Sequence, residues 1–215
     1  MDAATLQARI YAGYAKAALR IGYSADQYRP ASANNPLSVG NKLRSLPVSF
    51  NAEDMTYSKP NKYGKATWYG LFDGTLTQVG DYLVNEQDGT FFIAAQQTAL
   101  PILLVNCNRT INVLRPQQQT GLGAVGYGGD TDANETALMT AWPASVLQGT
   151  KGEKGEVSLP GDTRSPWWAI LLPAVAGVTL RTSDIVTDDL SRRYVISSAE
   201  LTDLGWRITA QQAQT

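Results

Sequence analysis

The sequence contains no histidine and only one cysteine, Cys107. Ser-His-Asp and Cys-His catalysis are excluded because both need an imidazole, and nearly all zinc and haem sites need imidazole or several thiolates. A disulfide within the chain is excluded too, and we interpret Cys107, at the end of the apolar run 101–107, as a small buried hydrophobic side chain. Any enzyme chemistry would have to use carboxylates, lysine, tyrosine or bound Mg²⁺. We therefore expect no enzyme, no cofactor and no resident metal.

Long apolar runs are also missing. No segment approaches the roughly twenty uninterrupted apolar residues of a membrane span, and the N-terminus lacks the order of a signal peptide. The 215 residues are 43% hydrophobic, enough for one large β domain or two small ones. The formal net charge of −1 gives no sign of a nucleic-acid binder. We expect a soluble protein made in the cytoplasm.

Charge is unevenly distributed along the chain. Residues 1–47 carry six basic and two acidic side chains, whereas residues 183–203 carry five acidic and two basic ones. Ends of opposite charge suit head-to-tail contacts between neighbours in a ring, although chance clustering on a solvated surface explains the pattern about as well.

Residues 3–21 are predicted to form a helix. Its apolar side chains recur at the helical period, and its basic side chains form a second stripe. The apolar set is Leu6, Ile10, Tyr14, Ala17 and Ile21, and the basic set is Arg9, Lys16 and Arg20. Such a helix could cover its own β core, dock on a partner or lie on a membrane. Membrane binding is the least favoured, because the apolar face is rich in alanine.

The segment 22–65 is rich in Ser, Asn, Pro and Tyr, and its four prolines are too closely spaced for long regular elements. It is predicted to be an extended arm or a long loop. An arm of this length could wrap a neighbouring subunit, and a flexible segment is the alternative.

Strand signals become dense after residue 65. Residues 67–72 and 75–79 flank the turn Asp73-Gly74, and 102–106 and 110–114 read as further strands. A turn leading into an aromatic and β-branched strand occurs at 80–96 and again, with a one-residue gap, at 183–199. The predicted fold is mainly β: an N-terminal α-helix and long arm, then a β-barrel or sandwich-like body built from two related β modules. The expected boundaries are 1–65 for the helix and arm, 66–116 for the first module, 117–164 for glycine-rich loops with short strands, and 165–215 for the second module, which could form a single domain with 66–116.

The glycine-rich region contains three patterns that resemble functional motifs. Residues 121–126 satisfy G-x-G-x-x-G, but no strand precedes them and no helix follows, so we interpret them as a loop. Glycine at every third position in 149–155 is too short for collagen. Asp130, Asp132 and Glu135 could hold a hard cation, but a solvated acidic turn is favoured because no loop signature surrounds them.

Trp167 and Trp168 are adjacent on a predicted strand and should point to opposite faces. One would enter the core and the other would meet solvent or a partner. Burial of both in a barrel wall is equally consistent with the sequence.

Several short motifs resemble virion structural proteins of tailed bacteriophages. They are Leu6-Gln7-Ala8-Arg9, Tyr28-Arg29-Pro30, Gly80-Asp81-Tyr82-Leu83, Thr90 to Gln97, Leu159-Pro160-Gly161-Asp162, Asp184 to Asp189, Arg193-Tyr194-Val195-Ile196 and Glu200 to Trp206. The resemblance implies a neck or tail component: a head–tail connector, adaptor or head-closure protein. Such a protein would assemble as a ring of about twelve or six copies with portal and tail proteins as partners. Its contacts with the passing genome would be weak and independent of sequence.

On this view the candidate interaction residues lie on the helix, at the start of the arm and on the tryptophan strand. They are Arg9, Lys16, Arg20, Tyr28, Arg29, Trp167 and Trp168. Two rival classes remain. One is a capsid-decorating or fibre-anchoring protein; the other is a carbohydrate-acting virion enzyme, in which Asp188 and Asp189 could be acid and base. Neighbouring strand residues project oppositely, so for that pair a solvated hairpin turn is favoured.

Overall fold

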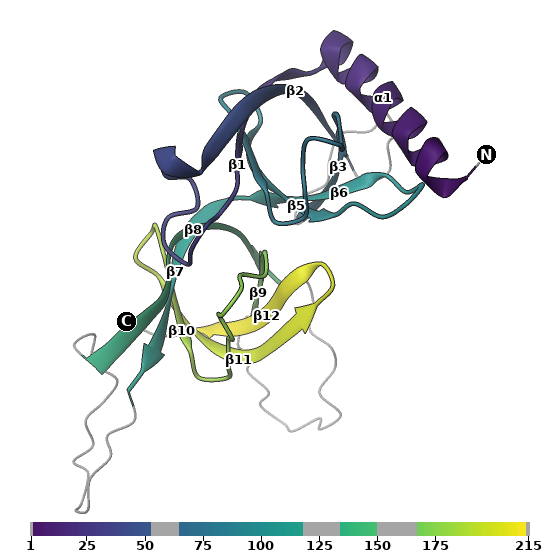
Figure 1. The fold of residues 1–215 in the computed structure, drawn as a ribbon. Coiled ribbons are helices and arrows are strands. Elements are labelled where there is room, and N and C mark those ends of the chain that lie inside the picture. Colours follow the sequence, from purple (N-terminus) through teal and green to yellow (C-terminus); the bar gives the residue numbers. More distant parts are fainter. Residues whose placement is uncertain (1, 53–64, 118–133, 150–166, 214–215) are drawn as a thin grey trace, which may run out of the picture.

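A computed structural model of the chain describes residues 2–52, 65–117, 134–149 and 167–213. Figure 1 shows a helix followed by two β-barrels stacked on each other, with the helix on the side of the first barrel that faces away from the second. The mainly β fold with an N-terminal helix and two related β modules, predicted from the sequence, is confirmed.

Helix α1 (Ala3–Ile21) has the predicted bounds. The carboxylate of Asp2 accepts a hydrogen bond from the Thr5 N–H at 2.7 Å and satisfies a free amide of the first turn. Tyr11, Tyr14 and Ala18 face the first barrel. The predicted apolar face is therefore only partly right: Leu6 and Ile21 are 42% and 51% exposed. An alanine-rich helix offers neighbouring stripes of similar hydrophobicity, and the tyrosines bury more area than the alanines between them.

The first barrel consists of β1 (Tyr23–Tyr28), β2 (Lys42–Ala52), β3 (Thr67–Leu71), β4 (Tyr82–Asn85), β5 (Gly89–Ala95) and β6 (Ile102–Cys107). All neighbouring strands are antiparallel, in the order β1-β2-β3-β6-β5-β4, and β4 pairs with β1 to close the ring. A short 3₁₀ helix, η1 (Val39–Asn41), precedes β2.

The second barrel consists of β7 (Arg109–Pro116), β8 (Glu135–Gln148), β9 (Trp167–Leu172), β10 (Ile185–Asp188), β11 (Arg193–Thr202) and β12 (Gly205–Gln212). Its order is β7-β8-β9-β12-β11-β10, and β10 pairs with β7. Strand for strand, this is the order of the first barrel. The chain therefore contains the same six-stranded topology twice.

The predicted hairpin repeat corresponds to β4–β5 and β10–β11. Tyr82 pairs with Phe92, and Ile185 pairs with Val195 at the same separation in sequence. The one-residue gap expected from the sequence is therefore unnecessary.

Three expectations about boundaries were wrong. About half of the described part of the supposed arm is barrel wall, because Tyr23–Tyr28 and Lys42–Ala52 pair as strands β1 and β2. Strand β7, assigned to the first module, belongs to the second barrel, since it pairs with β8 and β10. The region 117–164, assigned to glycine-rich loops with short strands, contains the 14-residue strand β8 of the second barrel. Prolines 30 and 36 lie in the β1–β2 connection, and Pro47 occupies a strand position.

The predicted strand 75–79 is also wrong. Residues 72–81 form consecutive turns, in which the N–H of Leu76 bonds to the carbonyl of Asp73 and the N–H of Asp81 to that of Gln78. Leu76 and Val79 are exposed there. Alternating hydrophobicity alone did not distinguish this turn-rich connection from a strand.

Alternate strand residues fill each barrel. Inside the first lie, among others, Leu83, Phe91, Ile93, Ile102 and Leu104. The matching positions in the second barrel hold Val186, Tyr194, Ile196, Ile208 and Ala210. Both sets are almost fully buried, so side chains of the described residues fill the interior of each barrel.

Outward-facing residues of the first barrel pack on the second. Tyr82 and Phe92 join the core cluster of the second barrel, and the Tyr82 ring lies edge-on to Trp142 at 6.0 Å between centroids. The Tyr82 hydroxyl donates to the carbonyl of Pro143 at 2.8 Å. Because this contact is apolar, buried and hydrogen-bonded, the two barrels pack together through a shared core cluster.

The connection between β1 and β2 also reaches the second barrel. The indole N–H of Trp142 donates to the carbonyl of Ala33 at 2.6 Å, and Asn34 forms a parallel bridge with Thr140. In the described part of 22–65, this connection is the one arm-like feature, and it packs on the second barrel of its own chain.

Candidate interaction site: two equivalent Arg–Asp clasps

Each barrel carries a buried aspartate gripped by an arginine, an arrangement named here the Arg–Asp clasp. In the first barrel Arg29 donates from Nε and Nη2 to the two carboxylate oxygens of Asp81, both at 2.8 Å. The carboxylate also accepts from the Gln78 N–H at 3.0 Å and from the Gln27 side chain at 2.6 Å. The Asp81 side chain is fully buried, whereas that of Arg29 is 37% exposed.

The second barrel repeats this arrangement. Arg115 donates from Nε and Nη2 to Asp184, both at 2.8 Å, and the N–H of Arg181 donates to the same carboxylate at 2.7 Å. Arg115 Nη2 also donates to the carbonyl of Thr179 at 2.8 Å. In the first barrel a different side chain donates to the corresponding backbone carbonyl: Gln27 donates to the carbonyl of Leu76 at 3.0 Å.

A tight turn before the aspartate places each carboxylate. Gly80 and Ser183, one residue earlier, have φ of 90° and 72°, a left-handed conformation that favours glycine. Their N–H groups donate to Ile93 and Ile196, and these isoleucines donate back to the carbonyls of Asp81 and Asp184. The hydrogen bonds fix the turn on β5 or β11 and point the carboxylate toward the arginine, which directly follows β1 in the first barrel and lies at the end of β7 in the second.

The arginines are held as fixed cations. The hydrogen bond to Asp81 raises the pKa of the Arg29 guanidinium, and the bond to Asp184 raises that of Arg115 in the same way. Bidentate pairing between a planar guanidinium and a carboxylate fixes orientation as well as charge. Each clasp therefore holds its turn in a fixed position on the barrel. The two clasps differ in the residues that surround them.

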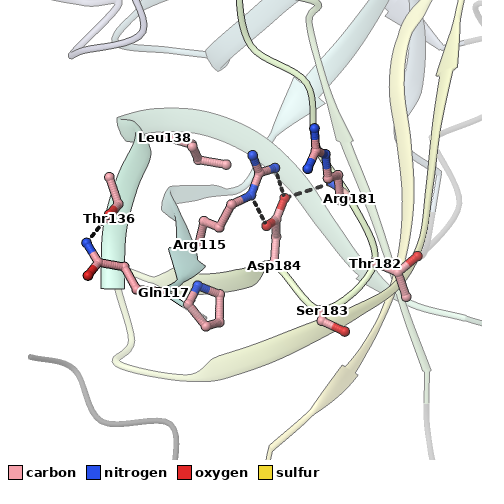
Figure 2. Close-up of a pocket in the computed structure, with 9 residues that line it drawn as sticks. Arg115, Gln117, Thr136, Leu138, Arg181, Thr182, Ser183 and Asp184 are labelled. Atoms are coloured by element: carbon pink, nitrogen blue, oxygen red, sulfur yellow. Dashed lines mark hydrogen bonds and ion pairs between the residues drawn. The ribbon is translucent and has the colours of Figure 1, made fainter. Parts of the chain in front are cut away.

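The two clasps border cavities of different size. Beside Arg29 and Asp81 the cavity is about 180 Å³ and is bounded on its far side by Trp142 and residues 173–176 of the second barrel. Beside Arg115 and Asp184 it is about 660 Å³ and is lined by second-barrel residues alone. Figure 2 shows the clasp of the second barrel with Thr136 and Leu138 on one side and Arg181, Thr182 and Ser183 on the other.

A second polar cluster lies at the β10–β11 turn. Asp188 accepts hydrogen bonds from the N–H groups of Leu190 and Arg192, from Arg192 Nε and from the Tyr194 hydroxyl. Burial opposes its ionisation, but these hydrogen bonds outweigh burial and lower the pKa of Asp188. Burial together with the bond to Asp188 raises the pKa of Tyr194 to about 12. The guanidinium of Arg192 lies over the Trp168 ring at 5.3 Å.

The expectation of a solvated turn at Asp188 and Asp189 was wrong for Asp188, which is buried. Asp189 is exposed and lies 3.9 Å from Arg109. A glycosidase acid needs a raised pKa, and that of Asp188 is lowered, so this pair is not arranged as an acid and a base.

The seven candidate residues do not form one site. Arg9, Lys16 and Arg20 are exposed on α1. Tyr28 packs against the contact between the barrels, and Arg29 belongs to the first clasp. Trp168 packs on the second core, edge-on to Tyr194 at 5.4 Å, while Trp167 lies beside Gly149.

The sequence analysis missed both clasps. A signal for the pair was present as a repeated dipeptide: Arg29-Pro30 directly follows β1, and Arg115-Pro116 ends β7. Most of the acidic side chains in 183–203 are also paired with arginines of the same chain. Within 4 Å of an arginine lie Asp184, Asp188, Asp189 and Glu200. Of the acidic residues in 183–203, Asp203 is the one for which the described structure shows no ion pair.

The remaining motif expectations fall mainly outside the described residues. This applies to 121–126, to most of 149–155, and to Asp130 and Asp132. Glu135 is described, and it pairs with Arg193. Within the described ranges, no group of three or more metal-ligating side chains comes together, and no helix is long and apolar enough to cross a membrane. Cys107 is half-buried against the core of the second barrel, and burial raises the pKa of its thiol.

Comparison with protein-family models, with curated proteins and with solved structures finds no match to this chain.

Proposed function

We propose that the chain is a non-enzymatic structural protein of a tailed-phage virion. It forms a ring at the head–tail junction, links portal to tail and surrounds the exit path of the genome. The single observation that carries the proposal is the duplicated barrel, whose two copies pack together through a shared core cluster. Repeated units that pack closely suit a ring wall, which must keep its shape while DNA passes.

The polar groups support the same role. The buried carboxylates Asp81, Asp184 and Asp188 are each bound by an arginine of the same barrel. Such groups are engaged in holding turns and strands together. A formal net charge of −1 fits a wall that lets a polyanion slide past, whereas a strongly basic surface would retain it.

Helix α1 offers a surface for a larger partner such as the portal. Lys16 and Arg20 are exposed on it, and beside them Leu19 is 71% exposed and Tyr23 is 55% exposed. Apolar and aromatic side chains rimmed by cations are suited to a protein interface.

The test is the copy number of this chain in purified particles of the phage that encodes it, by quantitative peptide mass spectrometry against the portal protein. The proposal expects about six to twelve copies per particle. Hundreds of copies would instead indicate capsid decoration, and absence from the particle would refute a virion role and reopen the enzyme alternative.

A second experiment locates the protein along the particle. Gold-labelled antibody against the chain should mark the junction of head and tail in electron micrographs. Label at the fibres or over the capsid shell would favour the fibre-anchoring or decorating alternative.

A further inference from the structure

We infer that the clasp face of the second barrel binds the turn after β3 in a second copy of this chain, so that copies associate head to tail. The clasp face is the surface around Arg115, Asp184 and Arg181, and the turn is Asp73–Leu76. The inference deepens the proposed function and rests on it only for closure of the chain of contacts into a ring.

The first step is that the equivalent face of the first barrel is already occupied. There Arg29, Asp81 and Gln78 line a 180 Å³ cavity together with the connection after β9, residues 173–176. Within the chain, this face thus lies opposite the loop that follows the third strand of the second barrel.

The second step is that, among the described residues, no loop of another barrel lies opposite the duplicate face. Arg115, Asp184 and Arg181 occupy the places of Arg29, Asp81 and Gln78. Within the described ranges, no residue of the first barrel lines the 660 Å³ cavity beside them, whose lining includes the partly buried Leu138 (Figure 2). Among the described residues, the clasp face of the second barrel therefore has no loop opposite it, whereas the equivalent face of the first barrel does.

The third step is that the matching loop of the first barrel is available. Asp73–Leu76 follows β3 as residues 173–176 follow β9. Thr75 and Leu76 are exposed and Asp73 is partly exposed. Tyr11 of α1 lies against Gly74, so the turn borders the side of the first barrel that carries the helix, and the carbonyl of Leu76 accepts a hydrogen bond from Gln27 of the first clasp. The two unused surfaces therefore lie on different barrels and can join successive copies.

The fourth step is charge. Gln78 meets the uncharged residues 173–176 within the chain. Between copies, the residue in the place of Gln78 is Arg181, and the incoming turn carries Asp73. Arg181 is exposed, and no ion pair of its guanidinium occurs in the described structure. An uncharged contact inside the chain becomes a complementary charged contact between copies, which favours one partner and one orientation.

The contact is heterologous, because two different patches meet. A heterologous contact continues from copy to copy until it closes as a ring or runs on as a filament. A symmetric dimer would instead bury the same patch on both copies.

The first experiment is a double-mutant cycle on the purified full-length chain, measured by sedimentation velocity over a range of concentrations. Arg181→Glu places two carboxylates together and should weaken self-association at least about fivefold. Adding Asp73→Asn removes the repulsion and should restore part of the affinity. Asparagine is chosen because Asp73 accepts hydrogen bonds from the Thr75 N–H and hydroxyl, which an amide oxygen can also accept.

Matched controls make the same charge changes elsewhere. Arg44→Glu and Asp203→Asn alter exposed residues in β2 and in the β11–β12 turn, and should leave self-association unchanged. An equal loss of association in Arg44→Glu and Arg181→Glu would overturn the proposed contact, and so would the absence of coupling between Arg181 and Asp73.

The second experiment detects the contact directly. Thr75→Cys and Thr182→Cys, in a Cys107→Ala background, place one thiol on each surface, and both threonines are exposed. A short bismaleimide should then give a ladder of covalent oligomers, whereas each single-cysteine chain should give no ladder, because it lacks the second thiol across the heterologous contact. A double-cysteine chain that stays monomeric at every concentration would overturn the inference.

The two proposals fail separately. A chain that forms the ladder but is absent from virions would retain the head-to-tail contact and lose the neck role. A chain present at ring-like copy number, but without coupling between Arg181 and Asp73, would retain the neck role and lose this contact.

Discussion

Asp81 and Asp184 occupy the same position in the two barrels, each one residue after a left-handed turn and each gripped by an arginine through two hydrogen bonds of 2.8 Å. Two parts of one chain have kept this arrangement while their surroundings differ. Asp81 also binds the Gln27 side chain, whereas Asp184 is bound by Arg115 and by the backbone N–H of Arg181.

The first prediction concerns the clasp carboxylates. Asp184→Asn keeps the shape but removes the charge that two arginine N–H groups bind, and an amide N–H would face the guanidinium. We expect the free energy of unfolding to fall by about 2–3 kcal/mol, less than for a fully buried pair because Arg115 is partly exposed. Urea titration followed by tryptophan fluorescence measures this change.

The control for the clasp is Glu200→Gln, which removes an exposed pair with Arg207 at 3.5 Å. Its effect should stay within about 0.5 kcal/mol. Equal effects of the two substitutions would contradict a structural role for the clasp.

The second prediction compares two glycines of the helical region. Gly22 follows α1 and donates to the carbonyl of Ala18 at 2.8 Å, and a Cβ there would clash with the carbonyl oxygen of Val48. Gly22→Ala should destabilise the fold by about 1–3 kcal/mol. Gly13 lies inside α1 with open space around it, so Gly13→Ala should stabilise by up to about 1 kcal/mol. Thermal unfolding should move Tm in opposite directions, and a shift in the same direction would be inconsistent with the packing of α1.

The third prediction concerns alkaline pH. The pKa of Tyr194 is raised from 10.0 to about 12 in the folded state, so its contribution is complete below pH 10 and is lost as pH rises toward 12. Stability should therefore fall across this window, and Tyr194→Phe should flatten that part of the profile. Unfolding free energies measured at several alkaline pH values test this, and an unchanged slope in the phenylalanine variant would count against it.

The fourth prediction concerns acid. The pKa of Asp188 is lowered, so its contribution is present above the unfolded-state value of 3.8 and is lost as pH falls through the lower folded-state value. Asp188→Asn should destabilise the protein at pH 7 and reduce the dependence of stability on pH below about 4. Chemical denaturation at pH 7 and pH 3 provides the measurement. If the unfolding free energy of Asp188→Asn fell with acid as steeply as that of the unsubstituted protein, other carboxylates would be responsible for the acid dependence.

The sequence predicted fold class, the helix bounds and the repeated hairpin because each depends on local periodicity and turn residues. It did not predict that residues 23–28 and 42–52 are strands. Prolines and polar residues made this segment read as an arm, yet β1 needs only inward-facing Ala25 and Gln27 to join the barrel. Barrel closure depends on pairing with β4, some fifty residues away along the chain, and no local pattern contains that information.

The clasps were hidden for a related reason. Arg29 was named as a candidate residue, but its partner Asp81 lies in a different hairpin, and the pair becomes visible only when β1 lies beside β4. The aromatic pair Trp167 and Trp168 was recognised, but its packing against Tyr194 and Arg192 depends on contacts across the second barrel.

The doubling of the barrel has a consequence for symmetry mismatch. A ring of these chains would present twice as many barrels as it has subunits. Similar barrels would therefore repeat twice per subunit around its wall. An adjoining ring with twice as many subunits could then be met one barrel to one subunit. Alternate contacts would use different sequences on the same backbone, so each barrel could be tuned separately to a partner that is itself uniform.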